Sequence, residues 1–156
     1  MKKKVKYLVM DVDGTLTDGK IYMSSSGEEF KVFNVKDGYG ITKLLKENNI
    51  EPIIITGRTS KILEKRCEEL EIQKLYQGVE EKLKLLLQLL EYEELGDIAY
   101  IGDDLNDLAC MEMIKKNGGL ISTPKDGACE LKKISDYVCA KCGGEGAVRE
   151  FIEWMI

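Results

Sequence analysis

The sequence predicts an α/β fold in which helices cover both faces of a doubly wound, Rossmann-like parallel sheet. Short apolar segments of strand length alternate along the chain with segments whose apolar residues recur at helical spacing. Such alternation is typical of parallel sheets that are buried on both faces. The 156 residues, of which 44% are hydrophobic, fit a single domain spanning residues 1–156.

Strands are predicted where apolar or β-branched residues follow one another. The first is the apolar run at residues 5–12, which ends in acidic residues, and the second, at residues 52–56, contains consecutive isoleucines. A serine- and glycine-rich turn at residues 24–27 separates two arms at residues 20–23 and 30–35, so a β-hairpin is predicted as an insertion after the first strand. Further strands are predicted at residues 75–76, 98–101 and 119–121.

Helices are predicted from apolar spacing and from one capping residue. Ile41, Leu44 and Leu45 give residues 39–48 an apolar face. Ser60 is a suitable N-cap for a helix that continues to Leu70. Further helices are predicted at residues 80–90, at 104–113, in a helix–strand pair at 127–138, and at about 145–155.

Composition excludes several classes of function. The net charge is −5 with both signs scattered, which argues against a nucleic-acid partner. No apolar run approaches the roughly 18–20 residues of a membrane span, and the basic start leads into a predicted strand, not a secretory signal. The five cysteines predict reduced thiols and a cytoplasmic location. Cys139 and Cys142 form one CxxC, but the chain has no histidine to complete a zinc site.

Polar residues follow the ends of the predicted strands. Asp11 and Asp13 end the first strand, Thr56 ends the second, and Asp103 ends the fourth. Lys82 follows the third strand by about one helical turn, in the pattern Gln-Gly-x-x-x-Lys. Because ligands bind at the carboxyl ends of parallel strands, we expect these side chains to form one site.

This set of residues suits phosphoryl transfer. Crowded carboxylates favour a divalent cation with oxygen ligands, and Mg²⁺ prefers one or two carboxylates plus a substrate phosphate. Asp11 is the predicted covalent nucleophile and Asp13 the acid and base for the leaving group and water. Thr56 offers its hydroxyl and its backbone N–H to a phosphoryl oxygen, and Lys82, with Lys84 as its rival, offers a positive charge. Asp103 is expected to hold the metal, with the two acidic residues Asp104 and Asp107 acting behind it or through water.

Three other interpretations of these residues predict different functions. Counted from Asp11 as an EF-hand calcium loop, glycine falls fourth and Tyr22 twelfth, so the pattern of that loop is not met. A response-regulator-like phospho-acceptor module would place its acceptor aspartate after the third strand, where this chain has Gln77 and Gly78. A non-catalytic binding module would require a decayed site, but no residue of the set is missing.

The motifs together resemble the haloacid-dehalogenase-like (HAD) phosphatases. Asp-x-Asp-Gly-Thr-Leu-Thr-Asp-Gly begins at Asp11, Ile-Thr-Gly-Arg ends at Arg58, Lys82 follows, and Gly-Asp-Asp-x-x-Asp ends at Asp107. The order and span match that family over nearly the whole chain. The resemblance implies a Mg²⁺-dependent phosphatase with a phosphoaspartate on Asp11. It also implies Mg²⁺ ligands from Asp11, from Asp103 and from the backbone carbonyl of Asp13.

The spacing of the motifs resembles one subgroup of that family. About 40 residues between Asp13 and Thr56, and about 25 between Thr56 and Lys82, leave no room for a cap domain. The segments at residues 33–40 and 143–150 resemble the capless subgroup that dephosphorylates 3-deoxy-D-manno-octulosonate 8-phosphate. That resemblance implies a homotetramer built around the hairpins, in which a neighbour's tail helps to close the site.

A phosphorylated sugar acid also needs a cation for its carboxylate. The turn formed by Thr56 and Gly57 should place Arg58 at the mouth of the site, and arginine binds carboxylates well. Arg66, further along the helix that follows Arg58, and the partner subunit's Arg149 are supporting candidates. An arginine at the position of Arg58 resembles the octulosonate branch. The alternative substrate is a nine-carbon, sialic-acid-type 9-phosphate, for which the resemblance implies glutamate at that position.

Overall fold

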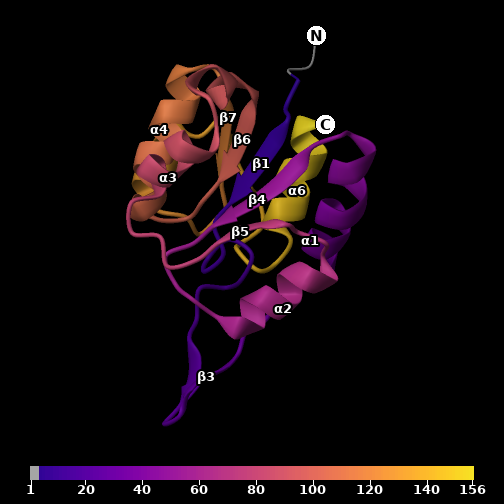
Figure 1. Cartoon of the computed structure of the whole chain (residues 1–156), viewed down its shortest axis with the longest axis vertical. Helices are drawn as coiled ribbons and strands as arrows, with labels where there is room; N and C mark the ends of the chain where they lie inside the picture. The colour runs from indigo at the N-terminus through magenta and orange to yellow at the C-terminus, as the bar shows by residue number, and fades with distance from the viewer. Residues whose placement is uncertain (1–3) are drawn as a thin grey trace.

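The computed structural model describes residues 4–156, apart from the side chains of Glu29, Tyr92 and Glu93, and contains a six-stranded parallel sheet (Figure 1). Met1–Lys3 of the basic start lie outside the described residues, and the single domain over residues 1–156 stays a prediction. The strand order β5-β4-β1-β6-β7-β8 reverses direction at β1, as in a doubly wound fold, which confirms the predicted fold class. The strands are β1 (Tyr7–Met10), β4 (Glu51–Ile55), β5 (Lys74–Tyr76), β6 (Ile98–Ile101), β7 (Leu120–Thr123) and β8 (Tyr137–Val138).

The register of the central strands sets the geometry of the site. Met10, the last residue of β1, pairs with Ile54 on one side and with Ile101 on the other. The backbone N–H of Asp11 donates to the carbonyl of Ile101 at 3.1 Å. The residues that follow β1, β4 and β6 therefore emerge side by side at one edge of the sheet.

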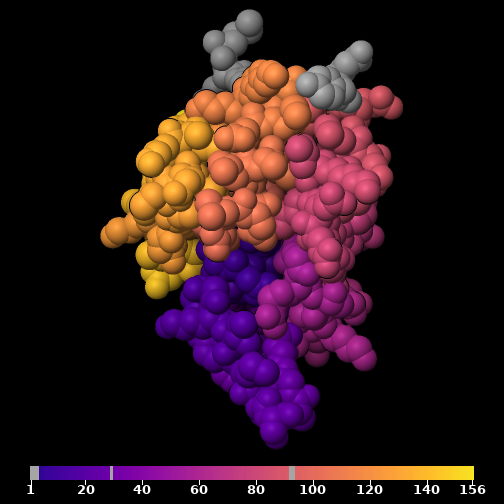
Figure 2. All heavy atoms as spheres, turned by 90° about the vertical axis from the view of Figure 1, so that its left-hand side faces the viewer, coloured from indigo at the N-terminus to yellow at the C-terminus, as the bar shows by residue number. Residues whose placement is uncertain are grey.

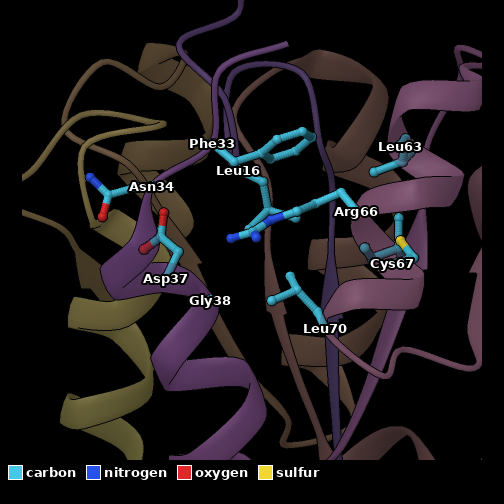
Figure 3. Close-up of a pocket in the computed structure, with 10 residues that line it drawn as sticks. Leu16, Phe33, Asn34, Asp37, Gly38, Leu63, Arg66, Cys67 and Leu70 are labelled. Carbon is cyan, nitrogen blue, oxygen red and sulfur yellow. The ribbon is translucent and has the colours of Figure 1, made fainter.

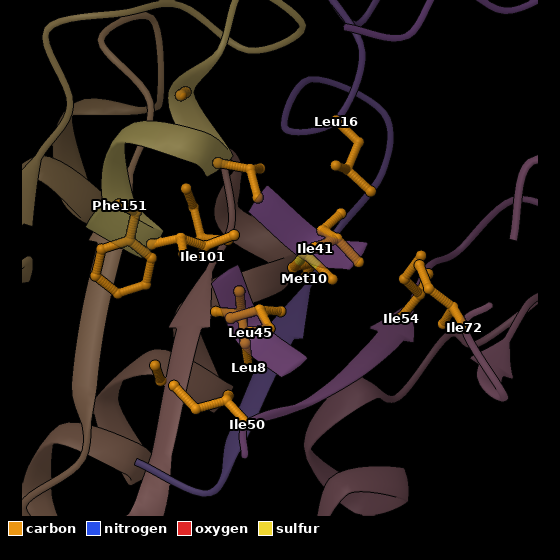
Figure 4. Close-up of a cluster of buried hydrophobic side chains, with 14 of the residues drawn as sticks. Leu8, Met10, Leu16, Ile41, Leu45, Ile50, Ile54, Ile72, Ile101 and Phe151 are labelled. Atoms are coloured by element: carbon orange, nitrogen blue, oxygen red, sulfur yellow. The ribbon is translucent and has the colours of Figure 1, made fainter. Parts of the chain in front are cut away.

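Helices cover both faces of the sheet, and alternating strand residues supply the two cores. Leu8 and Met10 pack on the face covered by the C-terminal helix, where Phe151 is fully buried (Figure 4). Val9 and Tyr100 pack on the opposite face. The first face carries α1 (Val35–Tyr39), the π-helix η1 (Gly40–Leu45), α2 (Lys61–Glu69) and α6 (Ala147–Met155). The second carries α3 (Lys82–Leu89), the 3-10 helix η2 (Tyr92–Asp97), α4 (Leu108–Lys116) and α5 (Cys129–Ile134).

A β-hairpin of β2 (Tyr22–Ser24) and β3 (Gly27–Phe30) projects from the carboxyl edge of the sheet (Figures 1 and 2). The hairpin was predicted, but its second arm lies earlier than the predicted residues 30–35. Asn34 caps α1 through its side chain, which accepts the N–H of Lys36 at 2.8 Å, so the helix begins at Val35. The predicted helix at 39–48 therefore starts four residues early and runs into η1.

The remaining predicted elements are present with shifted ends. Ser60 caps α2 as predicted, and its hydroxyl accepts the N–H of Leu63 at 3.4 Å. The predicted helix at 104–113 begins as the 3-10 turn η3 (Leu105–Asp107). The 3-10 helix η2 was not predicted, because no apolar periodicity marks it. None of the described helices is long and apolar enough to cross a membrane.

Candidate active site

A cleft of about 410 Å³ lies at the carboxyl edge of the sheet, and its lining residue Asp13 contacts Lys31, just beyond the hairpin. Its walls come from the residues that follow β1, β4 and β6, as the sequence predicted. The lining residues are Asp11, Asp13, Thr56, Gly57, Arg58, Asp103, Asp104, Leu105 and Asn106.

Asp11 and Lys82 form a buried ion pair behind this cleft. Nζ of Lys82, the first residue of α3, lies 2.8 Å from Oδ1 of Asp11 and 2.8 Å from Oδ1 of Asp107. Burial alone would lower the pKa of Lys82, but these two carboxylates outweigh it and raise that pKa. Its rival Lys84 is exposed and pairs with Glu81, so Lys82 is the lysine that reaches the carboxylates.

Asp107 is saturated with hydrogen bonds. Its Oδ1 also accepts the hydroxyl of Tyr100 at 2.7 Å, and its Oδ2 accepts the backbone N–H groups of Asp103 and Asp104. Burial, together with the charge of Asp107, raises the pKa of Tyr100 well above its ordinary value, so that phenol remains a donor. Asp107 therefore fixes Lys82 and the Asp103 loop, while its predicted place behind the metal ligands stays a prediction.

The carboxyl groups of Asp11 and Asp103 lie close together, and Lys82 contacts only the first of them. Carboxylate oxygens of these two residues and Asp107 lie within 4.8 Å of one another. Burial, and after it the adjacent Asp11, raises the pKa of Asp103 to about 8. Burial and the charge of Asp107 likewise raise the pKa of Asp11, against the opposing effect of Lys82. A divalent cation would relieve this repulsion, and the all-oxygen donor set fits Mg²⁺.

The turn after β4 presents Thr56, Gly57 and Arg58 to the cleft. Thr56 is buried, and its backbone N–H donates to the carbonyl of Tyr76 at 3.0 Å. The prediction that this N–H would serve the substrate is wrong, because pairing with β5 takes it. The hydroxyl of Thr56 is the group that can face a phosphoryl oxygen, while Arg58 is exposed at the rim.

Arg66 and Arg149 lie in a different place. Arg66 reaches from α2 across the face of Phe33 and lines a small pocket with Asp37 of α1 (Figure 3). Arg149 pairs with Glu153, and its guanidinium lies over the ring of Tyr39. Neither is among the described residues that line the cleft, so within one chain the structure does not bring them to Asp11.

Asp37 connects this pocket to the C-terminal helix. Its Oδ1 accepts the backbone N–H of Arg149 at 2.8 Å, which supplies α6 with the cap that Gly146 lacks. Burial raises the pKa of Asp37 to about 6, even though this N–H and nearby cations oppose the rise. Just before α6, the N–H of Gly144 donates to the carbonyl of Thr15 at 3.1 Å. The tail thus packs on the loop of its own chain that carries Asp13.

Three residues at the site were not predicted from the sequence. Thr15 donates its hydroxyl to Oδ1 of Asp103 at 3.1 Å, Tyr100 supports Asp107, and Lys31 lies 2.7 Å from Oδ1 of Asp13. Thr15 belongs to the first motif and could have been suspected. Tyr100 lies within a buried strand and Lys31 beyond the hairpin, where only the folded chain reveals their partners.

A doubly wound sheet with Asp11, Asp13, Thr56, Lys82 and Asp103 gathered at its carboxyl edge defines a phosphatase of the HAD type. No family model matches the chain. Curated proteins and solved structures nevertheless carry the same assignment, as the following similarities show.

The chain belongs to the KdsC family of HAD phosphatases, and it is a phosphoric monoester hydrolase. It is 45% identical to the 3-deoxy-D-manno-octulosonate 8-phosphate phosphatase KdsC of Salmonella typhi and 44% identical to that of Escherichia coli K12. Both similarities cover 99% of this chain and 80% of the relative. The crystal structure of the Yersinia pestis enzyme matches with a TM-score of 0.89 at 42% identity, covering 98% of this chain and 81% of that one.

A relative from Moraxella catarrhalis identifies the cofactor. That phosphatase was solved in complex with a magnesium ion, a phosphate ion and KDO, and it matches with a TM-score of 0.86 at 41% identity over 98% of this chain and 86% of that one. The cofactor is Mg²⁺, in agreement with the crowded oxygen donors of Asp11 and Asp103.

Gly14 provides a test of how closely the site is packed. Its φ is +92°, and a Cβ at this position would lie 2.0 Å from Oδ2 of Asp103. We expect Gly14→Ala to displace the Asp103 carboxylate and to weaken Mg²⁺ binding at least about tenfold, since a clash and a strained φ act together. Isothermal titration with Mg²⁺ measures the loss.

Gly27→Ala is the matched control for Gly14→Ala. Gly27 also has a positive φ, +121°, but a Cβ there meets nothing within 4 Å. It should cost about 1 kcal/mol or more of stability and leave Mg²⁺ affinity unchanged. Equal Mg²⁺ affinity in the two variants would contradict the expected clash.

Proposed function

We propose that the chain hydrolyses 3-deoxy-D-manno-octulosonate 8-phosphate through a phosphoaspartate on Asp11. The observation that carries this proposal is the buried Asp11 carboxylate, held by Lys82 at the base of a cleft that Asp103 and Thr56 also line. The names of the relatives supply the substrate: KdsC proteins with 42–45% identity are phosphatases of this compound.

In the first step, a carboxylate oxygen of Asp11 attacks the phosphorus of the monoester. The P–O bond to the sugar breaks, and the departing alkoxide takes a proton from the carboxyl group of Asp13. Lys82 and the Thr56 hydroxyl hold phosphoryl oxygens in place. Asp11, Asp103 and the backbone carbonyl of Asp13 would hold Mg²⁺, whose positive charge would let the Asp11 carboxylate and the phosphate approach one another.

In the second step, water attacks the phosphorus of the phosphoaspartate. The Asp13 carboxylate accepts a proton from this water, the P–O bond to Asp11 breaks, and inorganic phosphate leaves. Asp11 returns as a carboxylate and Asp13 as a carboxylic acid, ready for the next substrate. Asp107 keeps Lys82 in position in both steps.

Arg58 is the residue proposed to bind the substrate's carboxylate. It lines the rim of the cleft and is exposed, so its guanidinium is free to meet an anion at the end of the substrate away from the phosphate. The alternative substrate is a nine-carbon sugar-acid 9-phosphate, which also carries a carboxylate. The preference for the eight-carbon compound rests on the resemblance of Arg58 to the octulosonate branch, not on its charge.

The phospho-acceptor module without hydrolytic activity is not retained. The family is one of phosphatases, and β5 is followed by Gln77, whose side chain accepts the N–H of Ser60 at 2.8 Å. Gln77 thus has a structural part where such a module would carry its acceptor aspartate.

A homotetramer assembled through the hairpins is also proposed. Among the described residues, six of the ten exposed large apolar side chains lie between residues 21 and 39; these are Ile21, Met23, Phe30, Val32, Val35 and Tyr39. The hairpin is only two strands wide, so its backbone edges are open to pairing with other subunits. Covering this surface would bring neighbouring chains beside the cleft.

The five cysteines are free thiols, which suits the proposed cytoplasmic location.

Asp11→Asn tests the nucleophile. The amide keeps the size of the side chain but cannot form the acyl phosphate, so kcat for phosphate release should fall below detection. Asp13→Asn should also lose at least about a hundredfold because the alkoxide leaves unprotonated. Asp97→Asn, which removes a surface carboxylate paired with Lys6 just before β6, is the matched control and should keep full activity. Appreciable turnover by Asp11→Asn would defeat the mechanism.

Arg58→Ala tests recognition of the carboxylate. The variant should lose about 1.5–3 kcal/mol of transition-state binding, measured as kcat/KM on the octulosonate phosphate, because a charged hydrogen bond is removed. Sugar phosphates without a carboxylate should lose much less. Lys65→Ala removes an exposed cation of α2 and serves as the control. Equal losses on both kinds of substrate would show that Arg58 does not bind the carboxylate.

Light scattering tests the tetramer. The proposed assembly has four times the 17.6 kDa mass of one chain. Met23→Glu places a charge on a hairpin side chain that is 67% exposed and should shift the mass towards smaller species. Leu87→Glu, a comparable change on α3, should leave the mass unaltered. A wild-type chain that stays monomeric at working concentrations contradicts the proposal.

A further inference from the structure

Lys31 is a nearly buried lysine just beyond the hairpin, and its ammonium lies between two carboxylates. Its Nζ is 2.7 Å from Oδ1 of Asp13 and 2.8 Å from Oε1 of Glu28. The Lys31 side chain is 6% exposed, whereas that of Asp13 is 24% exposed. The hairpin thus places a shielded positive charge on the residue proposed to transfer the proton.

Glu28 holds this ammonium from behind. Its Oε2 accepts the hydroxyl of Ser60 at 2.5 Å, and Ser60 is the N-cap of α2. The N–H of Ser60 in turn donates to Oε1 of Gln77, which follows β5. A continuous set of hydrogen bonds therefore joins Asp13, on the loop after β1, to the start of the helix that follows the Thr56 turn.

We propose that Lys31 is a positioning residue for Asp13, anchored by Glu28 and Ser60, that fixes the proton-transferring carboxyl group for the reaction. This inference rests on the proposed function, because it assigns a second residue to the acid and base step. It makes the hairpin part of the catalytic arrangement and not only a surface for assembly.

The physical argument starts from the freedom of Asp13. A partly exposed carboxyl on a loop can adopt several rotamers, and proton transfer needs it within hydrogen-bond distance of the leaving oxygen. The shielded Lys31 ammonium donates to Oδ1 of Asp13, and this hydrogen bond can select one rotamer whether the carboxyl is ionised or carries its proton on the other oxygen. Burial would lower the pKa of Lys31, but its hydrogen bonds to Asp13 and Glu28 raise it, and the ammonium stays charged.

An ordinary surface ion pair does not account for these contacts. Glu28 and Lys31 are three residues apart, and such a local pair alone could form in solvent. The second contact joins Lys31 to a residue 18 positions away in the cleft, and the lysine is buried to make it. Burying an ammonium is costly unless both partners are present.

The experiment compares two leaving groups, so that a defect in proton transfer can be told apart from general damage to the site. Lys31→Met keeps the length and volume of the side chain without its charge, and Lys31→Arg restores the charge. Lys20→Met makes the same change at an exposed lysine just before the hairpin and is the matched control. Rapid-quench single-turnover rates of phosphoryl transfer are measured on the octulosonate phosphate and on p-nitrophenyl phosphate, whose leaving group needs no proton.

The expected result is a loss that depends on the leaving group. Lys31→Met should slow transfer from the sugar phosphate about tenfold to a hundredfold and from p-nitrophenyl phosphate less than about threefold. Lys31→Arg should recover most of the rate, and Lys20→Met should match the wild-type chain. Glu28→Gln, which keeps the shape of the hairpin, should show the same pattern more weakly and gives a second measure if Lys31→Met folds poorly.

Two results would overturn the proposal. One is an unchanged rate in Lys31→Met, and the other is an equal loss on both substrates in Lys31→Met and Glu28→Gln. Both results differ from failure of the proposed function. If the proposed function is wrong, the wild-type chain itself releases no phosphate from the octulosonate compound.

Discussion

The structure depends on placing several carboxylates together at one edge of a parallel sheet. Asp11, Asp103 and Asp107 are brought within a few ångströms by the pairing of β1 with β6, and one buried ammonium, Lys82, neutralises only part of their charge. Burial, and after it the neighbouring Asp11, raises the pKa of Asp103, and a bound cation would relieve this cost. The chain thus spends folding stability on a site that is complete only with its metal and substrate.

The packing around these carboxylates explains the small residues in the motifs. A Cβ on Gly102 would meet Cγ of Asp107 at 2.4 Å, and one on Gly14 would meet Asp103. Both glycines are needed for space next to an acidic side chain. Gly14 therefore allows close approach between two motifs far apart in the sequence, and Gly102 leaves room for the Asp107 carboxylate within its own motif.

Much of this architecture could be predicted from the sequence, for identifiable reasons. Parallel strands have a strong apolar signal, and the polar residue after each strand must lie at the same edge, so Asp11, Thr56 and Asp103 could be placed together. Helix ends were less predictable. The start of α1 depends on the Asn34 cap, and the N–H of Thr56 depends on pairing with β5.

Long-range polar contacts were beyond the reach of periodicity. Neither Lys31 nor Tyr100 stands in a motif, and their partners lie in other elements. Arg66, and Arg149 of the partner subunit, were predicted to support binding of the substrate's carboxylate. Within one chain the structure places both around Phe33, Asp37 and Tyr39, so any contribution of Arg149 across subunits stays a prediction.

The contact between Gly144 and Thr15 bears on how the protein is made. Residue 15 leaves the ribosome long before residue 144, yet the loop that carries Asp13 is completed by the hydrogen bond between them. β1 also needs β4 and β6 on its two sides before it is buried. Nearly the whole chain must therefore emerge before the nucleophile's loop is fixed. A nascent chain that has not yet released residue 144 therefore lacks a contact that the finished site has.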